Sequence, residues 1–270
     1  MSHTEFDCRM KAYENTHKNF LMKQTPVIIR IDGRAFHTFT RGLKKPFDAV
    51  LSSAMARTAE YLLNNISGCV FAYTQSDEIS LLLCDYATKK TEPWFDNNQQ
   101  KLTSLSASMA TLAFNKFFEE EAIREEIVAD GDLEYMDTLH KKMYKAIFDA
   151  RAFNIPKEEI VNYFIWRQQD ATRNSIQMVA QAHFSERQLH KKNTKDMQEM
   201  LMQEKGINWN DVPVKWKRGI AVYKKLATVT HTHNGETVTV ERQKSFIDKD
   251  MPVLTKDRNF IKREACLYVY

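Results

Sequence analysis

The order of strand-like and helix-like stretches constrains the fold of this 270-residue chain more than any other feature. Residues 27–31 (VIIRI) form a compact β-branched run that ends at Asp32-Gly33, a pattern typical of a strand followed by a tight turn. The later stretches are a helix from Phe47 to about Asn64, strands at 69–74 and 79–84, a helix at about 99–119, a charged helical insertion at 121–146 and a strand at 147–153. This βαββαβ succession predicts an α+β fold of the ferredoxin-like type, an antiparallel sheet with both helices on one face. Polymerase palms share this plan with many proteins that have no catalytic role, so the fold alone identifies no function.

Beyond residue 153 the pattern changes to helices and then a β-hairpin. Pro156 suits the first turn of a helix, where its missing N–H is harmless, and this helix is predicted to continue to about His183. Residues 219–230 and 236–241 then form the clearest hairpin in the chain, because the Asn234-Gly235 pair between them suits a type I′ turn. We therefore predict C-terminal helices and a hairpin appended to the palm-like core.

Composition is consistent with one compact unit. An apolar fraction of 43%, with only seven Gly and six Pro, favours a sizeable core without flexible linkers. We predict one catalytic unit over residues 1–270, with a palm core at about 26–153 and a helical and hairpin extension at about 154–270. The longest apolar run is far below the ~20 residues that span a bilayer, and the polar N-terminus lacks the apolar stretch of a signal peptide. Because the four cysteines also lack CxxC spacing, we expect a cytoplasmic protein without a membrane partner.

Two aspartates occupy positions that this fold would bring together. Asp32 ends the first strand and Asp77 lies at the tip of the central hairpin, which is adjacent to that strand in a ferredoxin-like sheet. Two carboxylates a few ångströms apart repel each other unless a divalent cation lies between them. Oxygen ligands favour Mg²⁺ over zinc, and the Gly33 carbonyl is a possible further ligand. The alternative, in which Asp32 caps a turn and Asp77 and Glu78 form a solvated hairpin tip, explains the bare pattern equally well.

The residues after Asp32 have the features of a phosphate-binding loop. Successive backbone amides could cradle a triphosphate as a nest, and they belong to Gly33, Arg34, Ala35, Phe36 and His37. Lys45, in the segment GLKKPFD, could reach the same triphosphate as a point charge. Taken singly, a solvated lysine before a helix is the plainer interpretation.

Five segments together resemble a known family. They occur in the order RIDGRAFHTF, KKPFD, AYTQSDEISLLL, YFIWRQQD and WKRG. In this order they resemble the tRNA-histidine guanylyltransferase family, including its bacterial and archaeal guanylyltransferase-like members, from about residue 5 to about residue 225. The resemblance implies a reverse-direction polymerase that adds nucleotides to the 5′ end of tRNA and uses a palm like that of ordinary polymerases.

The resemblance also implies roles for individual residues. Asp32 and Asp77 match the metal-binding aspartates of two or more Mg²⁺ ions, Gly33 matches the backbone-carbonyl ligand, and Glu78 joins the two aspartates in the catalytic set. The residues expected at the nucleotide are Gly33, Arg34, Ala35, Phe36, His37, Lys45, Asp48, Ser76 and Asn174. The residues expected at tRNA are Arg167, Arg173, Lys215, Lys217 and Arg218, and a net charge of +4 permits such a polyanionic partner. ATP and GTP are the implied substrates, and a homotetramer is the implied assembly.

The implied mechanism has two chemical stages. The 5′-monophosphate of tRNA first attacks the α-phosphate of ATP or GTP, which gives an activated 5′ end and pyrophosphate. The 3′-hydroxyl of an incoming GTP then attacks the activated phosphate and expels the nucleoside monophosphate. Each stage is an in-line phosphoryl transfer, so positioning and metal electrostatics supply most of the catalysis.

The chain departs from the eukaryotic pattern of the family at two places. Where eukaryotic members read HINN, this chain reads Thr172-Arg173-Asn174-Ser175, and Ala35 replaces an asparagine common in the first motif. The segment WRQQDATRNS looks like the guanylyltransferase-like branch, which favours templated 5′-end addition and repair of tRNA. Non-templated addition of G₋₁ to tRNA-His remains the alternative. A palm-fold nucleotidyl cyclase and a non-catalytic tRNA-binding protein are more distant alternatives.

Overall fold

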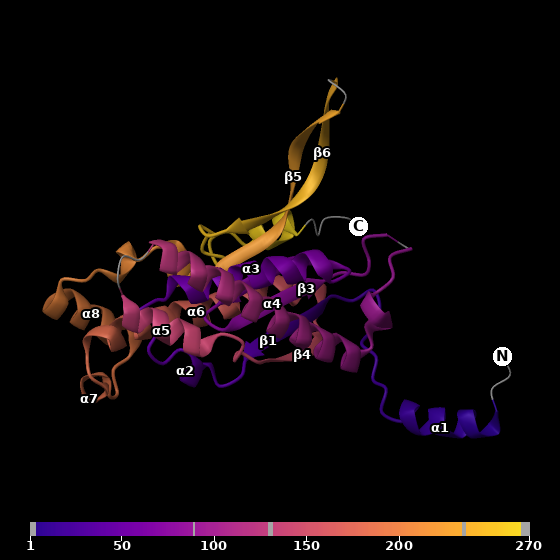
Figure 1. Cartoon of the computed structure of the whole chain (residues 1–270), viewed down its shortest axis with the longest axis horizontal. Helices are drawn as coiled ribbons and strands as arrows, with labels where there is room; N and C mark the ends of the chain where they lie inside the picture. The colour runs from indigo at the N-terminus through magenta and orange to yellow at the C-terminus, as the bar shows by residue number, and fades with distance from the viewer. Residues whose placement is uncertain (1–3, 89, 129–131, 234–235, 266–270) are drawn as a thin grey trace.

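One antiparallel sheet of six strands forms the centre of the molecule (Figure 1). The computed structural model describes residues 4–88, 90–128, 132–233 and 236–265. The strands are β1 Val27–Gly33, β2 Cys69–Gln75, β3 Glu78–Leu83, β4 Phe148–Asn154, β5 Ile220–His233 and β6 Glu236–Asp248. Their order in the sheet is β4-β1-β3-β2-β5-β6, and every neighbouring pair is antiparallel.

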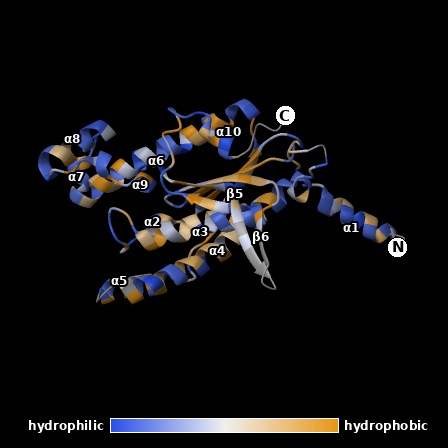
Figure 2. Cartoon of the chain, turned by 90° about the horizontal axis from the view of Figure 1, so that it is seen from above, coloured by the Kyte–Doolittle hydropathy of each residue, from blue (hydrophilic) through white to orange (hydrophobic). Residues whose placement is uncertain are grey.

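Helices cover both faces of this sheet (Figure 2). In the described part of the chain the α-helices are α1 Glu5–Asn15, α2 Phe36–Phe39, α3 Ala49–Asn65, α4 Gln99–Val128, α5 Leu133–Lys142, α6 Ile160–His183, α7 Glu186–Leu189, α8 Thr194–Lys205, α9 Val214–Arg218 and α10 Phe260–Glu264. Helices α3 and α4 lie on one face, and α6 and α10 lie on the other. None of the described helices is both long and apolar enough to cross a membrane.

The alternation of side chains along β1 explains the two cores. Ile29 and Ile31 point to the face covered by α3 and α4, whereas Ile28 points to the face covered by α6 and α10. All three side chains are fully buried. A strand that is apolar on both faces requires a layer of helices on each side, so the sheet becomes the middle of a three-layer molecule.

The predicted succession of strands and helices is confirmed. The elements β1, α3, β2, β3, α4 and β4 follow in the βαββαβ order, and the four strands lie in the order β4-β1-β3-β2. The sequence did not predict one feature of the structure: β5 pairs with β2 and extends the same sheet. The first residues of β5, Ile220–Tyr223, are buried, so the hairpin belongs to the core at its base and projects from the molecule at its far end (Figure 1).

Two predictions about element length and exposure need correction. Helix α4 continues to Val128, beyond its predicted end at about residue 119. The segment 121–146 was predicted to be an exposed insertion, but α5 buries Tyr135, Met136 and Leu139 against the main core. Its many charged residues, which lie on the solvent side, concealed this short apolar face.

The predicted hairpin is confirmed by the pairing of β5 with β6 and is longer than expected, while its Asn234-Gly235 turn lies outside the described residues.

Helix α1 differs from the other described α-helices because none of its residues is buried. Thr4 and Asp7 form a capping box that starts it. Its apolar side chains Phe6 and Tyr13 are 61% and 71% exposed. The helix stands away from the sheet and its covering helices (Figure 1).

Candidate active site

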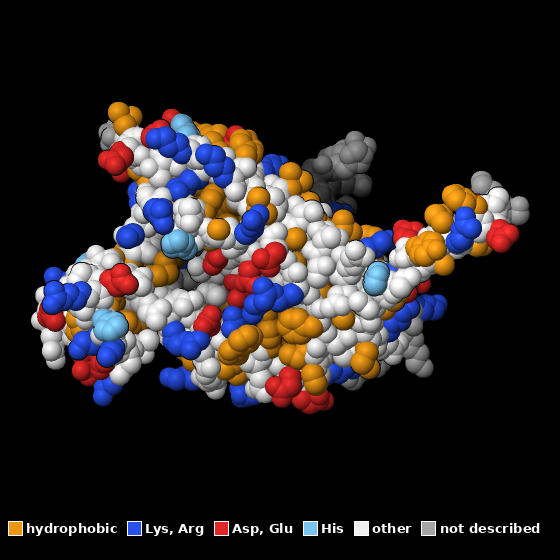
Figure 3. Space-filling view, turned by 90° about the horizontal axis from the view of Figure 1, so that it is seen from below, with side chains coloured by type: hydrophobic (Ala, Val, Ile, Leu, Met, Phe, Trp, Pro, Cys, Tyr) orange, Lys and Arg blue, Asp and Glu red, His pale blue; other side chains and the backbone are white. Residues whose placement is uncertain are grey.

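A cavity of about 630 Å³ opens where three segments meet: the β2–β3 turn, the loop before α3, and the C-terminal half of α6. The sequence-predicted residues in its lining are Phe36, His37, Lys45, Asp48, Ser76, Asp77, Asn174 and Lys215. Other cations in the lining are Arg41 and Lys44. In the space-filling view, basic side chains lie on several sides of the hollow between the α7–α8 lobe and the rest of the molecule, with acidic side chains beside it (Figure 3).

The ends of β1 and of the β2–β3 hairpin converge, as the sequence predicted. Asp32 lies opposite Glu78 in the sheet, and the Gly33 amide donates to the Asp77 carbonyl at 3.1 Å. Burial and the nearby charge of Asp32 both raise the pKa of the Asp77 carboxyl. The carboxylates are therefore close enough to repel each other.

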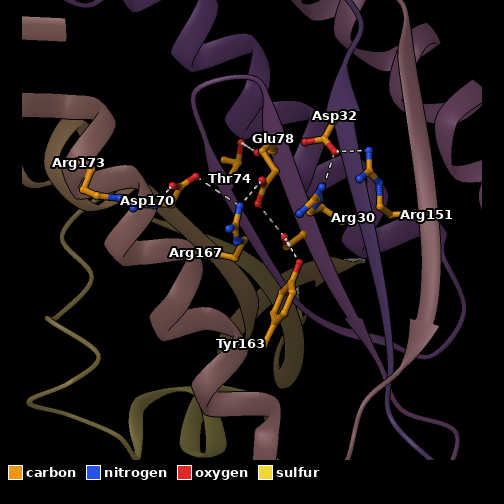
Figure 4. Close-up of polar contacts among 10 residues, drawn as sticks. Arg30, Asp32, Thr74, Glu78, Arg151, Tyr163, Arg167, Asp170 and Arg173 are labelled. Atoms are coloured by element: carbon orange, nitrogen blue, oxygen red, sulfur yellow. Dashed lines mark hydrogen bonds and ion pairs between the residues drawn. The ribbon is translucent and has the colours of Figure 1, made fainter. Parts of the chain in front are cut away.

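Two arginines hold the Asp32 carboxylate. Arg30 Nε lies 3.2 Å and Arg151 Nη2 lies 3.1 Å from the same oxygen, Oδ2 (Figure 4). Arg151 also lies 3.5 Å from Asp149. Because β1 places Arg30 directly opposite Arg151, the cationic pair is a consequence of strand register. Among the described residues, none donates a hydrogen bond to the other Asp32 oxygen, Oδ1.

The donor chemistry of this site fits Mg²⁺. Asp32 and Asp77 supply carboxylate oxygens, and Gly33 supplies a carbonyl. Across the described part of the chain, no group of three or more His, Cys, Asp and Glu side chains could hold a metal ion. Mg²⁺ commonly binds one or two protein carboxylates and takes the rest of its shell from water and substrate phosphates.

The predicted amide nest is narrower than expected. The amides of Gly33 and Arg34 donate to the carbonyls of Asp77 and Ile147, so two of the five predicted amides are committed within the protein. Ala35 adopts a left-handed conformation, with φ 54°, and precedes α2. Gly33 is required for packing, because a Cβ there would lie 2.2 Å from the Phe36 ring. The part of the nest that remains comprises residues 35–37.

Asp48 lines the cavity, but its carboxylate is engaged within the protein. It accepts hydrogen bonds from the Leu51 amide at 2.9 Å, the Lys44 amide at 3.0 Å and the Tyr135 hydroxyl at 2.7 Å. The first of these bonds caps α3. These contacts give Asp48 a structural function, in addition to the nucleotide contact predicted from the sequence.

Two residues predicted to contact tRNA are buried in this structure. Arg167 is 5% exposed and forms an ion pair with Glu78, while Lys217 is 7% exposed and donates to the Asn210 carbonyl. Both side chains are engaged in contacts within the protein in this conformation. Arg173, in contrast, is exposed and pairs with Asp170 at the surface of α6. Lys215 and Arg218 are partly exposed.

Sequence reasoning missed an aromatic wall of the cavity. The Phe47 and Trp216 rings stack with centroids 4.9 Å apart and an interplanar angle of 9°. Lys215 Nζ lies 4.5 Å from the centroid of the Trp216 ring. The two aromatic residues are far apart in the chain, and only the packing of α9 beside the loop before α3 brings them together. Their presence in the quoted segments KKPFD and WKRG was the available signal.

The comparisons with known proteins agree on one family. The family model described as "Thg1: tRNAHis guanylyltransferase" matches residues 7–156. A bacterial tRNA(His) guanylyltransferase (Thg1)-like protein in complex with ATP is 42% identical, with 98% of this chain and 100% of that chain covered and a TM-score of 0.82. A second such structure, in complex with GTP, is 41% identical over 97% of this chain and 99% of that chain, with a TM-score of 0.75. A probable tRNA(His) guanylyltransferase of Dictyostelium discoideum is 27% identical over 86% of this chain and 88% of its own length.

Proposed function

Because the chain belongs to the tRNAHis guanylyltransferase family and is a nucleotidyltransferase of that type, we propose that it adds templated nucleotides to the 5′ end of tRNA in the 3′–5′ direction. The observation that carries the proposal is the cavity, which joins Asp77 to the basic loop before α3 and to Asn174 of α6. A triphosphate needs such a set of cations beside an acidic metal site.

The proposed metal site consists of Asp32, the Gly33 carbonyl and Asp77. Bound Mg²⁺ would neutralise the charge that develops on the phosphates and on the leaving pyrophosphate. The chain's own contribution is to hold Asp32 between two arginines and to direct Asp77 toward the cavity.

The other side chains of the cavity hold the nucleotide in this proposal. Arg41, Lys44 and Lys45 place positive charge around the triphosphate, and His37 lies in the same lining. The stacked pair of Phe47 and Trp216 offers an aromatic surface for a base. The cavity thus positions the nucleotide whose α-phosphate the tRNA 5′-phosphate attacks, with release of pyrophosphate. The 3′-hydroxyl of an incoming nucleotide then attacks the activated 5′-phosphate of the tRNA and releases the nucleoside monophosphate.

Several finer properties belong to the same proposal. The four-strand unit β4-β1-β3-β2 serves as a polymerase-like palm. Exposed Arg173, together with Lys215 and Arg218, contacts the tRNA phosphates. By resemblance to the family we also propose that the protein is a cytoplasmic homotetramer.

One assay tests the function. The protein is incubated with Mg²⁺, ATP, labelled GTP and a tRNA that lacks its first 5′ nucleotide, and we expect label at the 5′ end. Tight tRNA binding without any label would reject the proposal in favour of a non-catalytic RNA-binding protein. Cyclic nucleotide formed from nucleoside triphosphate alone would instead identify a cyclase.

A matched pair of substrates separates repair from G₋₁ addition. One substrate is a 5′-truncated tRNA whose missing nucleotide has a template base, and the other is a full-length tRNA-His without G₋₁ and without a pairing base opposite it. Templated addition predicts faster labelling of the first substrate. Equal or faster labelling of the second would support G₋₁ addition.

A further inference from the structure

The sheet-facing side of α6 carries one charged residue among apolar and aromatic ones. Ile160, Tyr163, Phe164 and Arg167 have the spacing of one helical face, and all four are buried. A guanidinium that has lost its water must be compensated by a fixed partner, because removing a charge from water is costly. The position of Arg167 therefore requires an explanation from its contacts.

The contacts of Arg167 converge on Glu78. Arg167 Nη1 lies 2.8 Å from Glu78 Oε2, and the two side chains are 6% and 8% exposed. The same nitrogen lies 3.5 Å from Asp170, and the guanidinium carbon lies 3.4 Å from the centroid of the Trp166 ring. Within the described residues, Arg167 Nε is buried without a hydrogen-bond partner. The orientation that gives Arg167 its short ion pair with Glu78 therefore leaves one of its N–H groups without a hydrogen bond.

The second oxygen of Glu78 is held by Ser80 of β3, which in turn contacts Tyr163 of α6. Ser80 Oγ donates to Glu78 Oε1 at 3.2 Å, and the Ser80 and Tyr163 hydroxyls lie 2.8 Å apart. Both carboxylate oxygens of Glu78 are therefore fixed from the α6 side of the sheet, directly by Arg167 and through Ser80 by Tyr163. Figure 4 shows Glu78 directed toward Arg167, whereas Asp32 is directed toward Arg30 and Arg151.

The location of Glu78 makes this arrangement relevant to the site. Glu78 follows Asp77 in the chain and lies opposite Asp32 in the sheet. Three carboxylates at one place would compete for the same cations and repel one another. A cation buried on the α6 side neutralises one of the three and fixes its direction.

We propose that Arg167 is a positioning residue of the metal site. It holds Glu78 toward α6, so Glu78 is a fixed anion beneath the site, and it thereby fixes the β2–β3 turn that carries Asp77. This inference rests on the proposed function, and it replaces direct tRNA contact as the function of Arg167. The motif arginine acts through Glu78 and does not touch the substrate.

The test compares Arg167→Gln with Arg173→Gln, an exposed arginine on the same helix that pairs only with Asp170 among the described residues. For Arg167→Gln we expect a decrease in kcat of about 10- to 100-fold, the range typical for loss of a side chain that supports a metal site from outside its ligands. Mn²⁺ affinity, measured by electron paramagnetic resonance with GTP and without tRNA, should fall as well. The Kd for tRNA and its salt dependence should not change. Arg173→Gln should instead weaken tRNA binding and reduce the salt slope by about one, while its Mn²⁺ affinity should equal that of the wild type.

Three further outcomes are decisive. Weaker tRNA binding and a smaller salt slope in Arg167→Gln, with Mn²⁺ affinity intact, would overturn the inference. If Arg167→Gln does not fold, Glu78→Gln/Arg167→Gln should restore a wild-type melting temperature, because no unpaired buried charge remains; a double variant that stays unfolded would reject the pairing. If the wild-type protein labels no tRNA but binds Mn²⁺ more tightly than Arg167→Gln does, the inference stands and the proposed function is rejected.

Discussion

At the scale of single residues, the site balances carboxylates against arginines. Asp32 is paired with Arg30 and Arg151, and Glu78 is paired with Arg167. No ion pair is found for Asp77 among the described residues. Its side chain lines the cavity, so in the proposed site its charge is the one that a bound cation would balance.

Asp77→Asn should separate stability from activity. The amide removes a partly buried negative charge beside Asp32, so the metal-free variant should melt at the same or a higher temperature than the wild type. Mg²⁺ should raise the melting temperature of the wild type and not that of the variant, because only the wild type gains binding energy. The rate of nucleotide addition should fall by more than ~100-fold, which exceeds the loss usually caused by removing a residue that only supports a metal ligand. A variant that responds to Mg²⁺ as the wild type does would remove Asp77 from the metal site.

The cysteines offer a pH-dependent prediction. Burial raises the pKa of the Cys69 thiol from 9.0 to about 12 and that of Cys84 to about 11, whereas Cys8 is exposed. Between pH 9 and these values the unfolded thiols ionise and the folded ones do not, so stability is fully present below pH 9 and falls above it, by about 1.4 kcal/mol per pH unit for each thiol. At pH 8, iodoacetamide should alkylate Cys8 and spare the other two, as peptide mass spectrometry would show. Equal labelling of all three would contradict their burial.

At the scale of elements, a single carboxylate links the loop before α3 to two helices. Asp48 caps α3, accepts from the Lys44 amide and accepts from Tyr135 of α5. One side chain therefore joins a helix start, the basic loop and a second helix. The shape of the cavity wall depends on it.

Substitutions of Asp48 should distinguish a structural from a substrate-binding function. Asp48→Ala removes the cap and leaves buried donors unsatisfied, so it should lower the unfolding free energy by about 2 kcal/mol in urea denaturation. Tyr135→Phe removes one hydrogen bond and should cost about 1 kcal/mol. Asp48→Asn keeps a capping oxygen and should retain most of the stability. If Asp48→Asn loses GTP affinity without losing stability, the carboxylate also contacts nucleotide.

Local patterns predicted the elements better than the contacts between them. The β-branched run at residues 27–31 and the apolar spacing of α3 act over a few residues, so the sequence predicted both elements. The pairing of β5 with β2 joins residues about 150 positions apart, as in Ala72 opposite Val222, and no local pattern contains it. The burial of Arg167 depends on the same kind of information, because it arises only when α6 lies across the second face of the sheet.

For the candidate site, the same division holds. The convergence of Asp32 with Asp77 followed from strand order, and the sequence predicted it. The stacking of Phe47 on Trp216 and the removal of Lys217 from the surface did not follow, since both require the docking of α9 against α6. An arginine or lysine in a motif resembles a phosphate ligand until its burial is known.

At the scale of the whole molecule, the sheet joins the N-terminal and C-terminal halves of the chain. Two strands, β3 and β2, separate β1 from β5, so the residues near the proposed metal site and those of the cavity's far wall share one hydrogen-bonded framework. Gly219, at the start of β5, packs so closely that a Cβ would lie 2.6 Å from the Thr74 carbonyl. The predicted boundary near residue 153 therefore separates strands β1–β4 from β5 and β6 in the sequence, although all six belong to one sheet.

Limited proteolysis should reveal one part of the chain that does not share this framework. Helix α1 buries no residue, and backbone hydrogen bonds tie the chain to the body at Asn19 and Leu21. Helices of this length are marginal in water without packing. Trypsin should cut after Arg9, Lys11 or Lys18 well before it cuts within the sheet, as timed mass spectrometry would show. Slow cleavage there, at a rate equal to that of global unfolding, would mean that α1 is protected by contacts with another molecule.

The isolation of α1 has a consequence for how stability is measured. A helix without a shared core unfolds and refolds on its own, so its amide hydrogens should exchange at rates set by local helix–coil equilibrium. Circular dichroism would record this loss as a sloping baseline before the main transition. A single melting temperature therefore describes the sheet and the helices that cover it, but it does not describe the helix that precedes them.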